Sequence, residues 1–354
     1  MIRADLTAAL IVVFGFVASH LLFNVVFAAS ASMVGRMSQL PDERTVLSAS
    51  RAQGMSAAGL IFSATAVPMI LYFGARTSKS AGVSITVGVY TCLMVLGYLY
   101  VYKITSGKDP YDEAAADPRR ESGQPLAQII GLVFKNPPLL FLILTQMFSS
   151  TGFFIVTAFA YYYFAYVLND PAFLSRFILA ISIARLIGTF AAPWIGIRMG
   201  KRNSYWIFLA LAAVGFASAR FLHETAWSFT LTCCISAMFV SIAGALNTAL
   251  FSDTVVYGEW RTGKNIRAFT MGLMNLPIKA GVLLRSAVLS VGLMMIGFVA
   301  NAVPTPLVTE GISSIMTLTP AAVYAIAAAV FYLGYRIQES DVTQMQDEIA
   351  ARKR

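Results

Sequence analysis

Nine apolar runs, each long enough to cross a membrane as a helix, constrain the fold of this chain more than any other feature. A helix needs about 20 predominantly apolar residues to span the hydrocarbon layer of a bilayer. Hydrophobic residues make up 58% of the 354 residues and charged residues only 12%, too few to cover the surface of a soluble domain. We therefore predict an all-α membrane protein with about nine transmembrane helices. The predicted spans are residues 6–30, 53–74, 83–102, 139–167, 173–197, 205–222, 227–251, 270–299 and 317–336.

The basic residues between these spans gather on one side of the predicted membrane. Loops that carry excess Lys and Arg stay in the cytoplasm, so the C-terminus is predicted to be inside and the N-terminus outside, in the inner (plasma) membrane. The net charge of +9 is therefore read as a topology signal and not as a nucleic-acid-binding surface. The basic side holds Arg36, Arg44, Arg51, Lys103, Lys108, Arg119, Arg120, Lys135, Lys201, Arg202, Arg261, Lys264, Arg267, Arg336, Arg352, Lys353 and Arg354.

The longest polar stretch, residues 106–125, divides the spans unequally, three before it and six after it. A long polar linker followed by six spans is typical of a transporter with two helical bundles, each built from two three-helix inverted repeats. On that arithmetic the chain holds three of the four repeats, and the first is missing. The predicted division is residues 1–102 as the remainder of an N-terminal bundle, 103–137 as a cytoplasmic linker, 138–337 as a six-helix bundle and 338–354 as a cytoplasmic tail.

Few charged residues lie at membrane depth, where each costs on the order of 3 kcal/mol on insertion scales and so needs an explanation. Lys279 lies about ten residues into the eighth predicted span, with Asn275 one turn earlier on the same helix face. Pro277 cannot donate to the carbonyl of Leu273, which predicts a kink and a free acceptor near the lysine. Arg185 lies in the fifth predicted span, and Arg285 lies six residues after Lys279 in the eighth. Two explanations stay open for each of these charges, pairing with backbone carbonyls and contact with a solute.

Acidic residues are nearly absent from the predicted spans, the exception being Asp253 at the cytoplasmic end of the seventh. Coupling of transport to a proton or a sodium ion ordinarily uses a buried carboxylate, so the residues present do not support a coupling site. Two isolated histidines and so few buried acids supply neither a nucleophile with its base nor a metal cluster. We therefore expect no enzyme activity and no cofactor.

A dense charged tract, residues 253–269, follows the seventh predicted span and is expected to form a cytoplasmic turn. Its sequence resembles that of the glycoside-pentoside-hexuronide:cation symporters of the major facilitator superfamily, the family of the melibiose permease. Residues 41–51 and 196–203 resemble two cytoplasmic loops of the same family, and the resemblance covers essentially the whole chain as family helices four to twelve. The matching residues of the tract are Asp253, Tyr257, Gly258, Glu259, Trp260, Thr262, Gly263 and Lys264, followed by Lys279.

The chain departs from the family pattern at the positions associated with cations. Val256 stands where the family usually has a second acid, and Asn265 where it usually has a basic residue. The fourth family helix often carries an acid or an asparagine before Ile-Pro, and this chain has neither the acid nor the proline after Asn24. The resemblance thus implies coupling to Na⁺ or H⁺, whereas the residues present do not support it.

These observations favour a secondary transporter of a sugar, glycoside or uronide-type solute that works by alternating access in a lipid bilayer. The predicted solute contacts are Lys279 and the family-matched Arg51, followed by Asn275 and Gln146. Because the buried charges are positive, the solute is expected to carry a carboxylate, as a hexuronide does. A truncated or decayed remnant without transport, and a membrane scaffold, stay open as alternatives, as do the coupling ion, the direction of transport and the oligomeric state.

The charged tract itself is interpreted as a gate. Asp253 and Glu259 are expected to pair with nearby cations or with other cytoplasmic loops, and so to stabilise one access state without touching the solute. The cations considered as partners within the tract are Arg261, Lys264 and Arg267.

Overall fold

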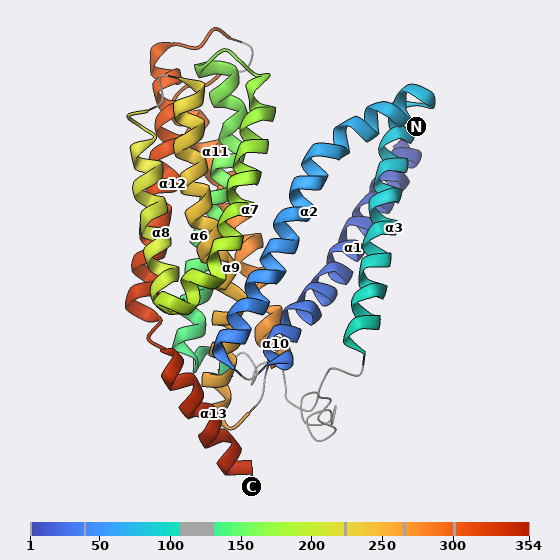
Figure 1. Cartoon of the computed structure of the whole chain (residues 1–354). Helices are drawn as coiled ribbons and strands as arrows, with labels where there is room; N and C mark the ends of the chain where they lie inside the picture. Colours follow the sequence, from blue (N-terminus) through green and yellow to red (C-terminus); the bar gives the residue numbers. More distant parts are fainter. Residues whose placement is uncertain are drawn as a thin grey trace.

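The computed structural model describes residues 2–38, 40–106, 131–222, 225–264, 267–299 and 302–353, and in these ranges it contains helices and no strand. Two helix groups make up the molecule (Figure 1). The smaller group holds α1 (Ile2–Met37), α2 (Pro41–Arg76) and α3 (Lys79–Thr105). The larger group, the six-helix bundle, is followed by a separate helix, α13 (Glu339–Lys353). The elements of the six-helix bundle are α6 (Pro137–Tyr162), the π-helical turn η1 (Tyr163–Val167), α7 (Phe173–Met199), α8 (Lys201–Ser218), α9 (Ala226–Thr262), α10 (Arg267–Gly272), α11 (Asn275–Met295) and α12 (Pro306–Gly334).

Every predicted span corresponds to a helical segment, and eight segments of the described chain are long and apolar enough to cross a membrane. The ninth, α8, is 18 residues long and begins with Lys201, Arg202 and Asn203, which lower the hydropathy of its whole length. It nevertheless packs between α9 and α12 inside the bundle. The helix groups begin and end within a few residues of the predicted division of the chain. That division into domains stays a prediction. Of the predicted linker, residues 103–137, residues 107–130 lie outside the described residues.

Several helices extend beyond the predicted spans or break within them; α2, for example, begins at Pro41 and not near residue 53. The last span was predicted from residue 317, but α12 begins at Pro306, where the side chain of Thr305 accepts a hydrogen bond from the Val308 N–H. That capped start is too polar to register as part of an apolar run. The eighth span was predicted as one helix, but it breaks at residues 273–274 into α10 and α11. The break lies just before Pro277, as expected of a proline that cannot complete the preceding helical turn.

The charged tract is not the turn that the sequence predicted. Helix α9 continues through it to Thr262 and stops only at Gly263, which adopts a left-handed conformation with φ of 68° and donates its N–H to the Glu259 carbonyl. Glycine adopts this conformation without steric cost, so it is the residue that ends the helix. The tract is helical because its apolar side chains, Val255 and Val256 among them, are buried against the bundle.

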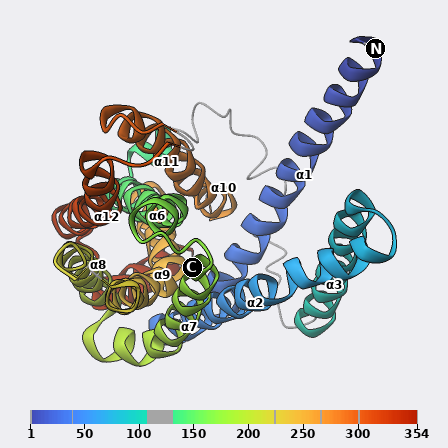
Figure 2. The same cartoon turned by 90° about the horizontal axis from the view of Figure 1, so that it is seen from above.

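The two helix groups approach each other at one end of the molecule and diverge toward the other (Figure 1). Viewed from above, α2 lies beside α7, one end of α1 reaches the bundle at α10, and α3 stands away from the bundle (Figure 2). At the converging end, which we call the charged end, the Ser48 hydroxyl of α2 donates to the Ala245 carbonyl of α9 over 2.6 Å. The same oxygen accepts from the Ala249 N–H over 3.2 Å. Polar contacts with the backbone of α9 therefore join the groups there.

Close approach of α7 and α9 depends on a glycine. A Cβ atom at Gly188 would lie against the Ser241 hydroxyl and 2.5 Å from the carbonyl oxygen of Met238. We therefore expect Gly188→Ala to lower the free energy of unfolding by about 1–3 kcal/mol, the cost typical of overpacking. Gly244→Ala, on a face of α9 with nothing within 4 Å, is the matched control and should not destabilise. Thermal denaturation in detergent compares the two, and equal melting temperatures would refute the packing argument.

Candidate solute site and charged end

Lys279 projects from α11 as an exposed side chain, and within the described part of the chain it makes no hydrogen bond or ion pair. Asn275, one turn earlier, is buried instead, and its amide donates to the side-chain oxygen of Asn24 on α1 over 2.9 Å. The two predicted solute contacts on α11 are therefore in different environments. Lys279 has free donors, whereas Asn275 links the two helix groups.

Arg51 lies where α2 meets α1 and α9. Its guanidinium stacks over the ring of Phe27 at 4.7 Å and reaches the Thr248 hydroxyl over 3.4 Å. The second contact is long for a hydrogen bond, and the side chain is half-buried. Most of the donors on Arg51 are thus uncommitted, while its position is fixed by aromatic stacking.

Gln146 belongs to a polar cluster inside the six-helix bundle. The hydroxyl of Tyr205 lies 3.1 Å from the Gln146 side-chain oxygen and 3.3 Å from that of Asn247. A hydroxyl has a single proton, so Tyr205 donates to one of the two at a time. At any time, therefore, one of the two amide oxygens lacks this donor. The sequence does not mark Tyr205 as part of a polar cluster. This residue directly follows the polar residues 201–204, where a tyrosine is unremarkable.

At the charged end, Asp253 is surrounded by cations from other segments. Its carboxylate lies 2.7 Å from the Lys201 ammonium and 3.7 Å from the Arg44 guanidinium, and all three side chains are almost fully buried. Arg44 also donates from Nε to the Ser38 carbonyl over 2.9 Å. Of the two kinds of partner expected for Asp253, the structure shows those from other loops rather than the cations of its own tract. Its partners come from the two other segments that carry the family resemblance, residues 41–51 and 196–203.

The rest of the charged tract faces the C-terminal helix. The indole N–H of Trp260 donates to the Glu348 carboxylate over 2.6 Å, and Arg352 donates to the Trp260 carbonyl over 2.8 Å. The hydrogen bond from Trp260, followed by one from Gln344, lowers the pKa of Glu348 below its ordinary value. The predicted tail is thus a helix attached to the end of α9. Of the other predicted gate residues, Arg261 donates to the Tyr257 hydroxyl over 2.9 Å, Lys264 is exposed, and Glu259 and Arg267 are half-buried with interactions of their own.

Attachment of the tail should depend on Trp260. In Trp260→Phe we expect the amide hydrogens of residues 339–353 to exchange several-fold faster, because the helix loses its hydrogen bond to α9. The attachment should also weaken as pH falls through the lowered pKa of Glu348, since a protonated carboxyl accepts this bond less well. Trp227→Phe, an exposed tryptophan at the start of α9, is the control. Unchanged exchange in the Trp260 variant would show that other contacts hold the tail.

Among the described residues no three His, Cys, Asp or Glu side chains are grouped so as to hold a metal ion. Asp253 has two cationic partners, so it presents no free carboxylate to a cation. Among the predicted solute contacts, those with uncommitted donors in the described chain are Lys279 and Arg51.

Comparison with known proteins agrees with this geometry. The family model described as "MFS/sugar transport protein" matches residues 2–339. The chain is 28% identical over 335 residues to a putative sulfoquinovose importer of Salmonella typhimurium, covering 94% of this chain and 69% of the relative. It is 26% identical over 345 residues to a glucuronide carrier protein homolog of Escherichia coli, covering 94% and 71%. A third relative is the isoprimeverose transporter of Lactiplantibacillus pentosus, 22% identical over 337 residues and covering 94% and 68%.

The fold is also that of a solved transporter. The crystal structure of FucP, a major facilitator superfamily transporter in its outward conformation, matches with a TM-score of 0.59 at 15% identity, covering 88% of this chain and 73% of that chain. The chain spans about two thirds of the length of the curated relatives it matches. The absence of the first three family helices stays a prediction. The chain is an integral, multi-pass membrane protein and belongs to the MFS/sugar transport protein family, as its resemblance to the glycoside-pentoside-hexuronide symporters predicted.

Proposed function

We propose that the chain is a secondary transporter that carries a sugar derivative with an anionic group by alternating access. The observation that carries the proposal is a set of three cations on the membrane-spanning helices, Arg185, Lys279 and Arg285. None of them has an acidic partner or a hydrogen bond among the described residues. Each charge costs on the order of 3 kcal/mol at membrane depth, and a carboxylate or sulfonate on the solute would offset that cost.

The relatives support an anionic solute without deciding it. A sulfoquinovose importer and a glucuronide carrier homolog are named for compounds with a sulfonate and a carboxylate, whereas the isoprimeverose transporter is named for a neutral disaccharide. The residues of this chain favour the first two, because its described spans hold cations that are not neutralised from within. A neutral solute would leave those cations without an anionic partner in the state that the structure describes.

The gate that we propose is the cluster of Arg44, Lys201 and Asp253. Arg44 belongs to α2, whereas Lys201 and Asp253 belong to the six-helix bundle, so the cluster closes the space between the two groups at the charged end. By the positive-inside rule this end faces the cytoplasm and the C-terminus is inside. On this proposal the structure represents a state closed toward the cytoplasm, and separation of Arg44 from Asp253 opens it.

We propose that Asp253 does not bind the coupling cation, because Lys201 and Arg44 already neutralise its carboxylate. The family resemblance implies Na⁺ or H⁺ as the coupling ion. Uptake measured with and without a Na⁺ gradient, and with and without a pH gradient, identifies the ion. If it is Na⁺, the dependence on Na⁺ should persist in any Asp253 variant that still folds, and its selective loss there would contradict this assignment.

The proposal is tested by uptake into proteoliposomes that contain the chain. Methyl β-D-glucuronide and methyl β-D-glucoside form a matched pair that differs only in the carboxylate, and methyl sulfoquinovoside supplies a sulfonate. We expect initial rates at least about tenfold higher for the two anionic solutes than for the glucoside, equivalent to about 1.4 kcal/mol of selectivity. Faster uptake of the glucoside, or of isoprimeverose, would contradict the assignment of an anionic solute.

A further inference from the structure

Arg185 is the least explained charge in the described part of the molecule. It lies in the middle of α7, its Nε atom is buried, and none of its donors makes a hydrogen bond within the described chain. The expectation that backbone carbonyls might pair with it is therefore not met there. Its guanidinium does stack over the ring of Phe153 on α6 at 4.1 Å. Stacking of this kind offsets part of the cost of the charge but leaves the N–H groups without acceptors.

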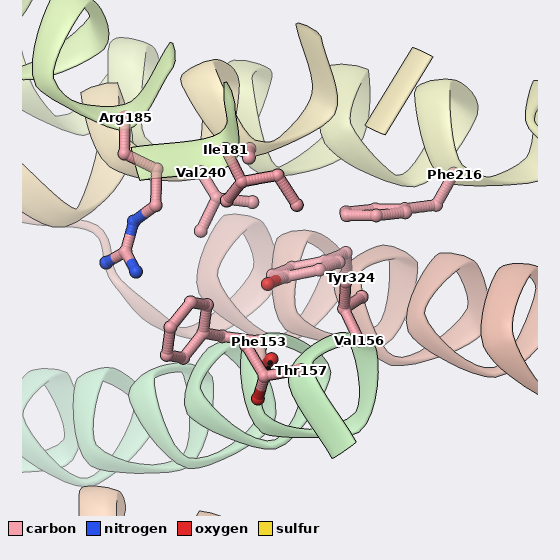
Figure 3. Close-up of a pocket in the computed structure, with 9 residues that line it drawn as sticks. Phe153, Val156, Thr157, Ile181, Arg185, Phe216, Val240 and Tyr324 are labelled. Carbon is pink, nitrogen blue, oxygen red and sulfur yellow. Dashed lines mark hydrogen bonds between the residues drawn. The ribbon is translucent and has the colours of Figure 1, made fainter. Parts of the chain in front are cut away.

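A small cavity adjoins Arg185 inside the six-helix bundle. Residues from α6, α7, α8, α9 and α12 line it, with Phe153, Thr157, Val240 and Tyr324 beside the arginine (Figure 3). The space open to the centre of a water molecule is about 20 Å³. A single water needs roughly 10–15 Å³ by the same measure, so the cavity accepts one small group and not a sugar ring.

The hydroxyl of Tyr324 points into this space from α12 (Figure 3). The Tyr324 side chain is 1% exposed, and its hydroxyl makes no hydrogen bond to any described residue. A buried hydroxyl without a partner costs free energy, as does a buried guanidinium without an acceptor. Two donors from different helices therefore meet a cavity whose other walls are mainly apolar. An acceptor with negative charge satisfies both.

We propose that one oxygen atom of the anionic group of the transported solute, a carboxylate or a sulfonate, enters this cavity, and that Arg185 and Tyr324 donate to it. The inference rests on the proposed function and names which of the three unpaired cations takes the charge. The planar guanidinium suits the paired oxygens of both groups. Phe153 and Val240 exclude water from the contact, which strengthens it. The sugar ring then stays outside the cavity.

Equilibrium binding to the detergent-purified chain, followed by calorimetry, separates this inference from the proposed function. The probes are methyl β-D-glucuronide, methyl sulfoquinovoside and methyl β-D-glucoside. In Arg185→Gln the affinity for both anionic probes should fall by about 10- to 100-fold while that for the glucoside changes by less than about twofold. Retained glucoside binding shows that the variant is folded. A larger loss with one anionic probe than the other identifies the natural class as carboxylate or sulfonate.

Two further variants provide controls. Tyr324→Phe removes only the hydroxyl and should weaken the anionic probes alone, by about three- to tenfold, the effect of one hydrogen bond. Arg176→Gln removes an exposed cation of α7, the helix of Arg185, which stacks over the ring of Phe173 at 5.7 Å, and should leave the ratio of glucuronide to glucoside affinity unchanged. If Lys279→Gln or Arg285→Gln removed the preference for glucuronide over glucoside and Arg185→Gln did not, the cavity would be excluded as the anion site. The proposed function would still stand. If the wild-type chain showed no preference for anions, both would fail.

Discussion

Replacement of Asp253 by asparagine is expected to lower the free energy of unfolding by about 3–5 kcal/mol, because it leaves buried cations without their counter-charge. Lys201 and Arg44 are both almost fully buried, and the Asp253 carboxylate is the acid that pairs with each of them. Thermal denaturation in detergent measures the loss. Asp42→Asn, an exposed acid in the first turn of α2, is the matched control and should cost less than about 1 kcal/mol.

The same variant should also change the population of access states. Arg44 belongs to one helix group and Asp253 to the other, so loss of the carboxylate removes an ionic contact that holds the groups together. Distances between spin labels placed on α2 and α9 at the charged end should lengthen in the variant. A double-mutant cycle with Lys201→Met then isolates the contribution of the shorter pair. Unchanged stability together with unchanged distances would remove the cluster from any gating role.

The second large effect is expected at Lys279. Its ammonium is exposed and has no partner in the described chain, so it is available to the hydroxyls of a bound sugar. Lys279→Gln should lower the uptake of glucuronide and glucoside in parallel, by about 10- to 100-fold, as loss of a charged hydrogen bond implies. Arg198→Gln is the control, because Arg198 is an exposed cation that stacks on Trp194 at 4.2 Å near the end of α7. Normal uptake in Lys279→Gln would show that this lysine only faces the lipid headgroups.

The helical architecture could be predicted from sequence because apolar runs report directly on spans. The boundaries that failed did so where local chemistry outweighs hydropathy. α12 begins eleven residues early at a capped, polar turn after Thr305, and α9 runs past its apolar part until Gly263 ends it. Neither position has an unusual hydropathy. Both have the residue type that begins or ends a helix, which capping arguments identify better than a hydropathy window does.

Individual residues of the candidate site could be proposed from the sequence, but their contacts with one another could not. Lys279 was predicted because a charge at membrane depth is conspicuous in any sequence, whereas Arg51 was predicted from the family resemblance. The partners of Asp253 were missed because Lys201 and Arg44 are far from it along the chain, and only tertiary packing brings them together. Tyr205 and Tyr324 were missed for another reason. Tyrosines are common in membrane proteins, so neither residue is distinguished by sequence from one that lies in the headgroup region.

Solute exchange across the membrane tests the central claim most directly, because it requires a binding site that faces each side in turn and does not depend on the coupling ion. Proteoliposomes containing the chain are preloaded with unlabelled methyl β-D-glucuronide and diluted into a trace of the labelled compound. We predict transient accumulation of label, and little accumulation when the interior holds methyl β-D-glucoside instead. Accumulation no greater than in protein-free liposomes would contradict transport by this chain, and equal accumulation with both preloaded solutes would contradict its preference for an anion.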